Sequence, residues 1–454
     1  MAFLTQNPAT GRVIQEYPVW GANELEAALA DVARATPLWA DTPLSVRCAL
    51  LQSMGDEIMR RRDALAALIT QEMGKLIKES RAEVEKSAHV CHYYADNAAR
   101  FLADEMVDSD ASKSFVAHQP LGTILAVMPW NFPLWQVFRF LAPALAAGNT
   151  GVLKHASNVP QCALVIEDVV RSAGLPEGVF RTLMISSSQV AGVIADPRIH
   201  AVTLTGSESA GRQVAATAGA HLKKTVLELG GSDPFIVLED ADLDWAVQQG
   251  VASRYLNAGQ SCIAAKRFIV VETVADEFVA RFKTAVQKLR AGDPMDETTT
   301  LAPMAREELR DELHQQVQRS IDAGAIAVAG CAPVEGVGAY YQPSILDHVK
   351  PGMAAWSEEL FGPVAIVIRV KDEGDAIAIA NGSDFGLGGS VWTQDLIRGE
   401  RIARQVQSGA VFVNGMVKSD PRLPFGGVKN SGYGRELSYH GMMEFVNQKT
   451  VWVR

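Results

Sequence analysis

From residue 122 onward, short apolar segments alternate with helical segments, and this alternation restricts the possible folds more than any other feature of the sequence. Four apolar segments predict buried strands at residues 122–128, 150–154, 201–205 and 225–229. The stretches between them predict helices near residues 133–147, 157–173 and 207–218. Buried strands joined by helices are typical of a parallel sheet with crossover helices.

A second series of strands follows the first. Its apolar segments cover residues 235–238, 267–271, 365–370, 389–392 and 410–413. Two successive α/β domains, each a doubly wound parallel sheet, fit this order and meet near residue 230. Residues 23–100 have a helical pattern instead, and Asn23 with Glu26 predicts a capping box at the start of the first helix. Residues 443–453 predict an edge strand that could pair with a partner chain.

Length and charge restrict the class of protein. A chain of 454 residues with 48 % hydrophobic and 21 % charged residues predicts two or three packed domains. No apolar run reaches the roughly 18 residues that span a bilayer, and the start lacks a secretory pattern, so a cytoplasmic protein is expected. The net charge of −10 argues against nucleic acid or an acidic membrane surface as partner. An anionic substrate would therefore need local positive charge.

The sequence shows no pattern for a metal site or a disulfide framework. Its five cysteines are Cys48, Cys91, Cys162, Cys262 and Cys331. They are odd in number and widely spaced, without Cys-x-x-Cys. Neither His-Glu-x-x-His nor Gly-x-Ser-x-Gly occurs, so no metal site and no serine hydrolase are predicted.

Cys262 is the candidate nucleophile. It ends the segment Gly-Gln-Ser-Cys at 259–262, which follows a helical stretch and precedes the strand at 267–271. A cysteine at such a polar turn is more accessible than one inside an apolar run. An ordinary buried thiol would fit the same position.

Glu228 and Asn131 are candidates for general base and oxyanion donor. Glu228 lies between two leucines in Leu-Glu-Leu-Gly-Gly at 227–231, and desolvation there would raise its pKa. A capping or salt-bridged carboxylate explains the position equally well. Asn131 lies between two prolines in Pro-Trp-Asn-Phe-Pro at 129–133, so its amide could be held toward an oxyanion or form an Asx turn.

Residues 205–211 end a predicted strand and begin a predicted helix, with Gly206 and Ser207 at the turn. The backbone N–H groups of such a turn could hold a phosphate. No Gly-x-Gly-x-x-Gly or Gly-x-x-x-x-Gly-Lys-Ser/Thr loop occurs, so a standard Rossmann or P-loop site is not predicted.

Together, seven segments resemble the aldehyde dehydrogenase superfamily over nearly the whole chain. In order they lie at 129–133, 152–157, 205–207, 227–231, 259–262, 358–363 and 424–432. One such segment would be a weak signal, but their order and spacing are specific. The resemblance implies an α/β fold with two doubly wound parallel-sheet domains and a small oligomerisation arm.

The resemblance implies covalent catalysis by Cys262. This thiol attacks the aldehyde carbon, and Asn131 with the Cys262 backbone N–H holds the oxyanion. After hydride transfer, Glu228 activates the water that hydrolyses the acyl-enzyme, which favours a free acid over transfer to coenzyme A. The resemblance assigns contacts with the dinucleotide to Trp130, Lys154, Ser157, Gly206, Ser207, Leu229, Glu359 and Phe361.

The resemblance also bears on cofactor choice. Members with glutamate at the position of Ser157 favour NAD. A serine removes the carboxylate that would repel a 2′-phosphate, so NAD or NADP is the expected cofactor. His155 is the only close candidate for a cation at that phosphate.

Arg139 and Ser419 match the substrate contacts of the succinate-semialdehyde dehydrogenases. An arginine eight residues after Asn131 is suited to bind a carboxylate at the far end of the substrate. A salt bridge between domains is the alternative. A second arginine of that pattern is replaced by Leu256, and the candidates to compensate for it are Arg254, Lys418 and Arg422.

The resemblance implies boundaries and an assembly. The dinucleotide-binding domain would comprise 1–101 and 121–230, the catalytic domain 231–435, and the arm 102–120 and 436–454, in a homodimer or homotetramer. Oxidation of succinate semialdehyde is the predicted activity. The alternatives are a dehydrogenase of glutarate semialdehyde or of a neutral aliphatic aldehyde, a cofactor-independent thiol hydrolase or acyltransferase, and a non-catalytic protein on the same fold.

Overall fold

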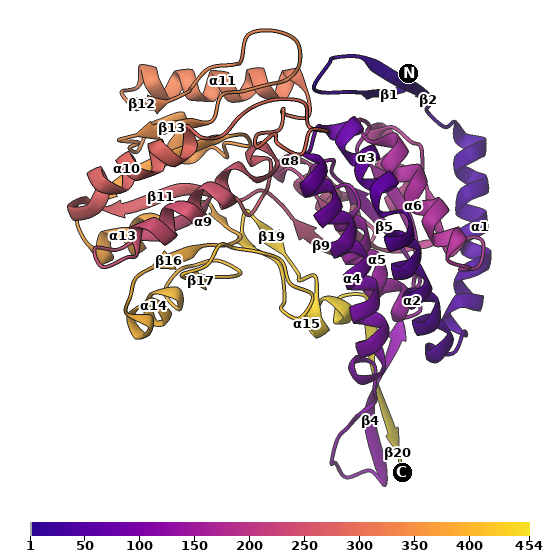
Figure 1. Cartoon of the computed structure of the whole chain (residues 1–454). Helices are drawn as coiled ribbons and strands as arrows, with labels where there is room; N and C mark the ends of the chain where they lie inside the picture. The colour runs from indigo at the N-terminus through magenta and orange to yellow at the C-terminus, as the bar shows by residue number, and fades with distance from the viewer. Residues whose placement is uncertain (1) are drawn as a thin grey trace.

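The computed structural model describes residues 2–454, and its strands form two large sheets and three small ones (Figure 1). None of the helices in this range has the length and apolar character needed to cross a membrane. The two large sheets contain the two predicted strand series, so the predicted α/β fold with parallel sheets is confirmed.

The first large sheet has the strand order β19-β9-β8-β5-β6-β7. Its strands are β5 (Thr123–Met128), β6 (Thr150–His155), β7 (Phe180–Thr182), β8 (Ile199–Thr205), β9 (Lys224–Glu228) and β19 (Gly432–Tyr433). All pairs are parallel except β19 with β9. Every residue of β6 is buried, as expected for a parallel sheet that is covered on both faces.

The second large sheet has the order β12-β13-β14-β11-β10-β16-β17. Its strands are β10 (Asp233–Val237), β11 (Ala265–Val271), β12 (Ile326–Ala329), β13 (Ser344–Asp347), β14 (Val364–Val370), β16 (Ser390–Trp392) and β17 (Phe412–Val413). Only β12 is antiparallel to its neighbour. Apolar side chains on β10, β11 and β14 pack against the helices on both faces and form the core of this half.

Helices connect and cover the strands. They are α1 (Ala22–Ala40), α2 (Leu44–Arg60), α3 (Arg62–Met73), α4 (Ile77–Phe101), α5 (Trp135–Ala146), α6 (Pro160–Ser172), α7 (Val190–Ala195), α8 (Glu208–Ala220), α9 (Leu243–Tyr255), α10 (Glu272–Val286), α11 (Glu307–Asp322), α12 (Ala354–Ser357), α13 (Glu373–Asn381), α14 (Leu396–Ala403) and α15 (Ser438–Met443). Two 3₁₀ turns are η1 (Ser187–Gln189) and η2 (Leu256–Gly259). The predicted helices near 133–147, 157–173 and 207–218 correspond to α5, α6 and α8.

The predicted capping box at Asn23 is wrong by two residues. Helix α1 begins at Ala22, with Gly21 as its N-cap. The Glu24 carboxylate accepts a hydrogen bond of 3.0 Å from the Gly21 backbone N–H. Glu24 is therefore the glutamate of the capping box, the role that was predicted for Glu26. Glu26 instead forms an ion pair with Arg198 at 2.8 Å.

A three-stranded sheet projects from the body of the molecule (Figure 1). It consists of β3 (Glu105–Met106), β4 (Lys113–Pro120) and β20 (Val446–Val453). Strand β20, which was predicted as an edge strand over 443–453, pairs antiparallel with β4 of its own chain. Its other edge has no partner strand among the described residues, which leaves it available for pairing with a further strand.

Two small hairpins complete the strands, β1 (Ala2–Gln6) with β2 (Val13–Pro18), and β15 (Phe385–Gly386) with β18 (Val428–Lys429). After β17 the chain returns to the first sheet, where Gly432 of β19 pairs with Glu228 of β9. This return connects the two halves beside the carboxyl end of β9.

Candidate active site

The segment that precedes Cys262 makes a tight turn with a left-handed backbone. Asn257, Ala258 and Gly259 all have φ between 52° and 74°. Such φ values are unfavourable for residues other than glycine, so the turn must be held by its surroundings. The Asn257 amide donates to the backbone carbonyls of Asn131 and Gln260, which fixes the turn at the start of the nucleophile segment.

The side chain of Arg254 stabilises the same turn through hydrogen bonds. Its guanidinium is fully buried and donates to the carbonyls of Gly259, Leu360 and Gly362. A Cβ on Gly259 would overlap the Gly362 carbonyl oxygen, so only glycine fits at this contact. Arg254 is therefore committed to the backbone and does not replace the missing second substrate arginine.

Cys262 lines a cavity of about 420 Å³. Its other walls come from α4, from the start of α5 and from residues 416–425. Burial raises the pKa of the Cys262 thiol to about 12, although the charges of Lys266 and Arg139 act in the opposite direction. The thiol is therefore protonated near neutral pH and needs a proton acceptor before it can attack.

Lys266 ties the nucleophile segment to residue 359. Its ammonium donates to the carbonyls of Ser261 and Cys262 at 2.9 and 2.8 Å, and it pairs with the Glu359 carboxylate at 3.0 Å. Glu359 also accepts from the backbone N–H of Gly231 at 3.1 Å. Through Lys266, Glu359, which is predicted to bind the dinucleotide, is connected to the backbone of Cys262.

Asn131 lies beside the nucleophile segment, as an oxyanion donor requires. Its side-chain NH₂ donates to the Gln260 carbonyl at 3.0 Å, and its oxygen accepts from the Gln136 amide at 3.1 Å. The second bond fixes which end of the amide faces Gln260. One amide proton remains for an oxyanion on a substrate bound at Cys262.

Glu228 ends β9 and is almost fully buried, at 2 % exposure. Neither of its carboxyl oxygens has a hydrogen-bond partner in residues 2–454. Burial raises its pKa well above the usual value, and the nearby carboxyl group of Glu436 adds to this effect. A Cβ on Gly231 would lie 2.7 Å from the Cys262 carbonyl oxygen, so the turn after Glu228 packs directly against the nucleophile segment.

Arg139 lines the same cavity as Cys262, but its charge is already compensated. Its guanidinium forms an ion pair with Glu436, and both side chains are 3 % exposed. It also donates to the Thr205 hydroxyl at 3.3 Å and lies 4.7 Å from the centre of the Phe425 ring. The sequence predicted a salt bridge only as the alternative, and the partner, Glu436, lies far away in the chain.

Lys86 on α4 is a cavity residue that the sequence did not indicate. Its ammonium donates to the Ser419 hydroxyl at 2.6 Å and lies 4.2 Å from the centre of the Trp135 ring. Ser419 is thus placed in the cavity, as predicted from its position near the Pro-Phe-Gly-Gly segment. The helical pattern of α4 gave no signal for Lys86, because a lysine on such a helix is usually solvated.

The two other candidate cations differ from Lys86. Lys418 lines the cavity but is exposed. Arg422 is exposed and pairs with Asp420 at 2.6 Å. Neither has a buried partner that would hold it in place.

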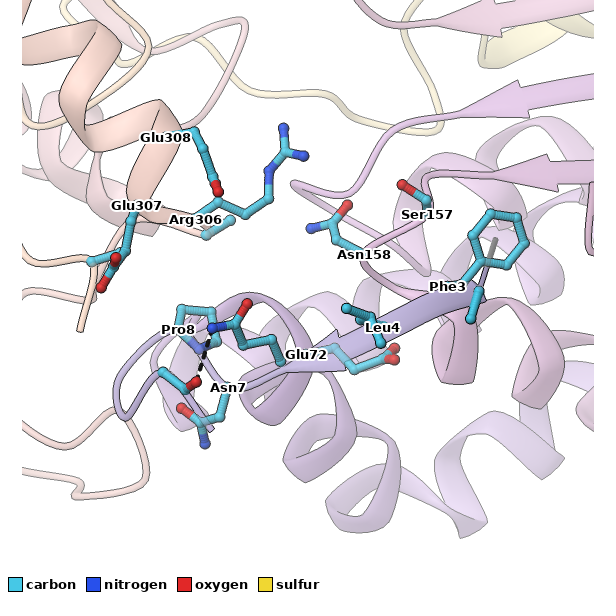
Figure 2. A pocket seen from close by; sticks show the side chains of 15 residues that line it. Phe3, Leu4, Asn7, Pro8, Glu72, Ser157, Asn158, Arg306, Glu307 and Glu308 are labelled. Carbon is cyan, nitrogen blue, oxygen red and sulfur yellow. Dashed lines mark hydrogen bonds between the residues drawn. The ribbon is translucent and has the colours of Figure 1, made fainter. Parts of the chain in front are cut away.

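A second cavity, of about 290 Å³, lies beside Ser157 (Figure 2). Ser157 and Asn158 come from the segment after β6, Arg306 comes from the start of α11, and β1 forms the opposite wall. The side-chain nitrogen of Asn158 is buried without a hydrogen-bond partner in the described chain, which fits a missing polar ligand. Arg306 forms no ion pair with the residues described, and the carboxylates of Glu72, Glu307 and Glu308 line the same cavity.

His155 does not supply a positive charge. Its ring is buried and its Nε2 is 2.9 Å from the Pro133 carbonyl. Burial lowers the pKa of His155 to about 4, so the ring is neutral near pH 7. His155, the close candidate for a cation at a 2′-phosphate, is therefore not supported, and the sequence did not indicate Arg306 because it is distant from Ser157 in the chain.

The remaining predicted dinucleotide residues lie at the ends of strands in the first sheet or face it from the second half. Lys154 is the next-to-last residue of β6, and burial lowers its pKa without a carboxylate partner. Gly206 and Ser207 precede α8, where the Ser207 hydroxyl accepts the Ala210 N–H as an N-cap. The rings of Trp130 and Phe361 are 5.9 Å apart and meet edge to face. Leu229 fills the space that the absent side chain of Gly211 leaves.

Comparison with known proteins identifies the family of this chain. A protein of Synechocystis sp. named "Probable succinate-semialdehyde dehydrogenase [NADP(+)]" is 52 % identical over 454 residues. A Mycobacterium ulcerans protein named "Succinate-semialdehyde dehydrogenase [NADP(+)] 1" is 51 % identical over 457 residues. Both comparisons cover 100 % of each chain. The structure of succinic semialdehyde dehydrogenase from Streptococcus pyogenes in complex with NADP+ is 38 % identical, covers 100 % of both chains and superposes with a TM-score of 0.98. The model of the Aldehyde dehydrogenase family matches residues 2–451. The chain therefore belongs to the aldehyde dehydrogenase family.

Proposed function

We propose that this enzyme oxidises succinate semialdehyde to succinate, with NAD or NADP as the oxidant and Cys262 as the nucleophile. The observation that carries the proposal is one cavity that holds the Cys262 thiol together with Arg139, Lys86 and Ser419. Such a cavity suits a short aldehyde whose other end is an anion. The names of the Synechocystis and Mycobacterium relatives support the same substrate.

The chain's own residues perform the covalent steps. The Cys262 thiol releases its proton to water and its sulfur attacks the aldehyde carbon, while the carbonyl oxygen becomes an oxyanion that the Asn131 amide stabilises. A bound nicotinamide would supply the acceptor for the hydride that leaves the former aldehyde carbon, which would leave a thioester on Cys262. Glu228 then takes a proton from water, whose oxygen attacks the thioester and displaces the Cys262 sulfur. The balance is one aldehyde, one oxidised cofactor and one water to one carboxylate, one reduced cofactor and two protons.

The residues around the first sheet fit a dinucleotide. Lys154 is a buried cation without a carboxylate partner, which suits ribose hydroxyl groups or a phosphate. The N-terminus of α8, which follows Ser207, suits an anion, whereas the Gly206 N–H donates to the Glu228 carbonyl at 3.0 Å. Ser157 leaves room for a 2′-phosphate, and Arg306 in the same cavity provides its counter-charge. Trp130, Leu229, Glu359 and Phe361 complete the proposed site.

The proposal extends to organisation and assembly. The first sheet with α1 to α8 would bind the dinucleotide (1–101 and 121–230), and the second sheet would carry the nucleophile (231–435). Residues 102–120 and 436–454 would form an arm through which copies associate as a dimer or tetramer. The exposed edge of β20 supports this assignment. A cytoplasmic location fits the acidic chain and is part of the same proposal.

The test follows the absorbance of the reduced nicotinamide with succinate semialdehyde and with butanal, each with NAD and with NADP. The expected kcat/KM is at least about tenfold higher for the semialdehyde, a difference of about 1.4 kcal/mol. Equal values for both aldehydes would contradict the substrate. Thioester hydrolysis without any cofactor reduction would instead favour the thiol hydrolase. The variant Cys262→Ser controls for reduction that does not depend on the nucleophile.

A further inference from the structure

We infer that Lys86 is the principal positively charged contact of the substrate's remote carboxylate, with the Ser419 hydroxyl beside it. The inference rests on the proposed function, because it names the group that distinguishes a semialdehyde from a neutral aldehyde. Helix α4, which carries Lys86, lies outside both segments that the sequence assigns to substrate binding.

The position of the Lys86 ammonium is well defined. The Ser419 hydroxyl accepts from it at 2.6 Å, and the Trp135 ring lies against it with 4.2 Å between nitrogen and ring centre. Both neighbours line the same cavity as Cys262. A hydroxyl group and an aromatic face orient a cation but do not neutralise it. Lys86 is therefore held at the cavity wall with its charge still available.

The other cations of this cavity are compensated or exposed. Arg139 pairs with Glu436, and Lys75 pairs with Glu83 where both side chains are fully buried. Within the described range no carboxylate lies within 4 Å of the Lys86 ammonium. Lys78 and Lys418 are exposed, where water screens their charge. An entering carboxylate thus meets one partly desolvated and uncompensated cation.

The electrostatic surroundings of Lys86 agree with this role. Burial, and then the positive charge of Arg139, lower the pKa of Lys86 to about 8, while Glu83 and Asp420 raise it and Lys418 lowers it slightly. A carboxylate that binds here compensates the positive charge of the Lys86 ammonium and accepts a charge-assisted hydrogen bond from it. Arg139 compensates the charge of Glu436 beside Glu228. This ion pair should affect the oxidation of both kinds of aldehyde equally.

The test compares Lys86→Met with the wild-type enzyme on succinate semialdehyde and on butanal. Loss of a charge-assisted hydrogen bond predicts a fall of about 10- to 100-fold in kcat/KM for the semialdehyde. The value for butanal is expected to change by less than about threefold, since it has no carboxylate to lose. Lys86→Arg should retain most of the semialdehyde activity, because the charge is kept. Lys86→Gln, which keeps a hydrogen-bond donor for Ser419 but no charge, should resemble Lys86→Met.

Two further variants separate contact from general effects. Lys78→Met removes the same charge from the same helix. In the wild-type protein the Lys78 ammonium donates to the Thr299 carbonyl at 3.0 Å, so this variant should keep the selectivity between the two aldehydes. Arg139→Met leaves Glu436 without its counterion and should lower kcat/KM for both aldehydes alike. An equal loss on both aldehydes in Lys86→Met, or a selective loss in Arg139→Met alone, would overturn the inference. A wild-type enzyme that does not prefer the semialdehyde would contradict the proposed function instead.

Discussion

At the scale of single residues, the site combines a nucleophile and a base whose pKa values are both raised by burial. Burial raises the pKa of Cys262 to about 12 and that of Glu228 well above its usual range. The Cys262 thiol therefore needs a proton acceptor before it can attack. The raised pKa of Glu228 suits a general base.

The first residue prediction concerns Glu228→Gln, which keeps the shape of the side chain and removes its ability to take a proton. Thioester formation should persist, while hydrolysis slows by about 100- to 10,000-fold. Rapid mixing with succinate semialdehyde and NADP should show a burst of about one reduced cofactor per Cys262, followed by a slow phase. Loss of the burst together with the steady state would place Glu228 before the thioester and contradict its assignment.

The second residue prediction is a dependence of selectivity on pH. Lys86 is charged below its pKa of about 8 and neutral above it. The ratio of kcat/KM for succinate semialdehyde to that for butanal should therefore be constant at low pH and fall as the pH rises through about 8. Titration of Cys262 and Glu228 affects both aldehydes and cancels in the ratio. A ratio that stays flat to pH 10 would contradict a charged Lys86 contact.

The third residue prediction concerns the cofactor. Ser157→Glu places a carboxylate at the cavity shared with Arg306 and should lower kcat/KM for NADP by at least about tenfold, since it repels a 2′-phosphate. The value for NAD should change little or rise. Ser157→Gln has a similar size without the charge and serves as the matched control. Equal losses with NAD and NADP would indicate a steric effect.

At the scale of elements, the turn of η2 determines where Cys262 lies. Arg254→Met should remove three hydrogen bonds to backbone carbonyls and lower the free energy of unfolding by about 3 kcal/mol. Denaturation in urea measures this loss. Any remaining activity should fall for succinate semialdehyde and butanal in parallel. A selective loss on the semialdehyde would show that Arg254 contacts the substrate.

The elements also show how far the sequence could be interpreted. Continuous apolar runs such as those of β5 and β8 identified the strands, because a strand buried on both faces needs no polar alternation. The seven segments were enough to predict catalytic roles for Cys262, Asn131 and Glu228. Lys86 and Glu436 could not be found this way, since their partners Ser419 and Arg139 are distant from them in sequence. The start of α1 was misplaced because glycine at the N-cap gives a weaker signal than asparagine.

At the scale of the whole molecule, the projecting sheet is the surface through which copies are proposed to associate. Replacing Val451 in β20 by proline removes a backbone donor and should disturb pairing along this strand. Light scattering coupled to size exclusion should then show a smaller assembly than that of the wild-type protein. Proline at Val337, in an exposed loop, is the control and should leave the assembly unchanged. An unchanged mass for the Val451 variant would contradict association through β20.

The pairing of β20 with β4 also has a consequence for biosynthesis. Val446 pairs with Pro120 and Val453 with Lys113, so the sheet joins strands from opposite ends of the polypeptide. While the ribosome makes the chain, β4 has only β3 to pair with until residues 446–453 have emerged. This sheet is therefore completed only after both large sheets have been translated. Unfinished chains, which lack β20, also lack the strand proposed for association.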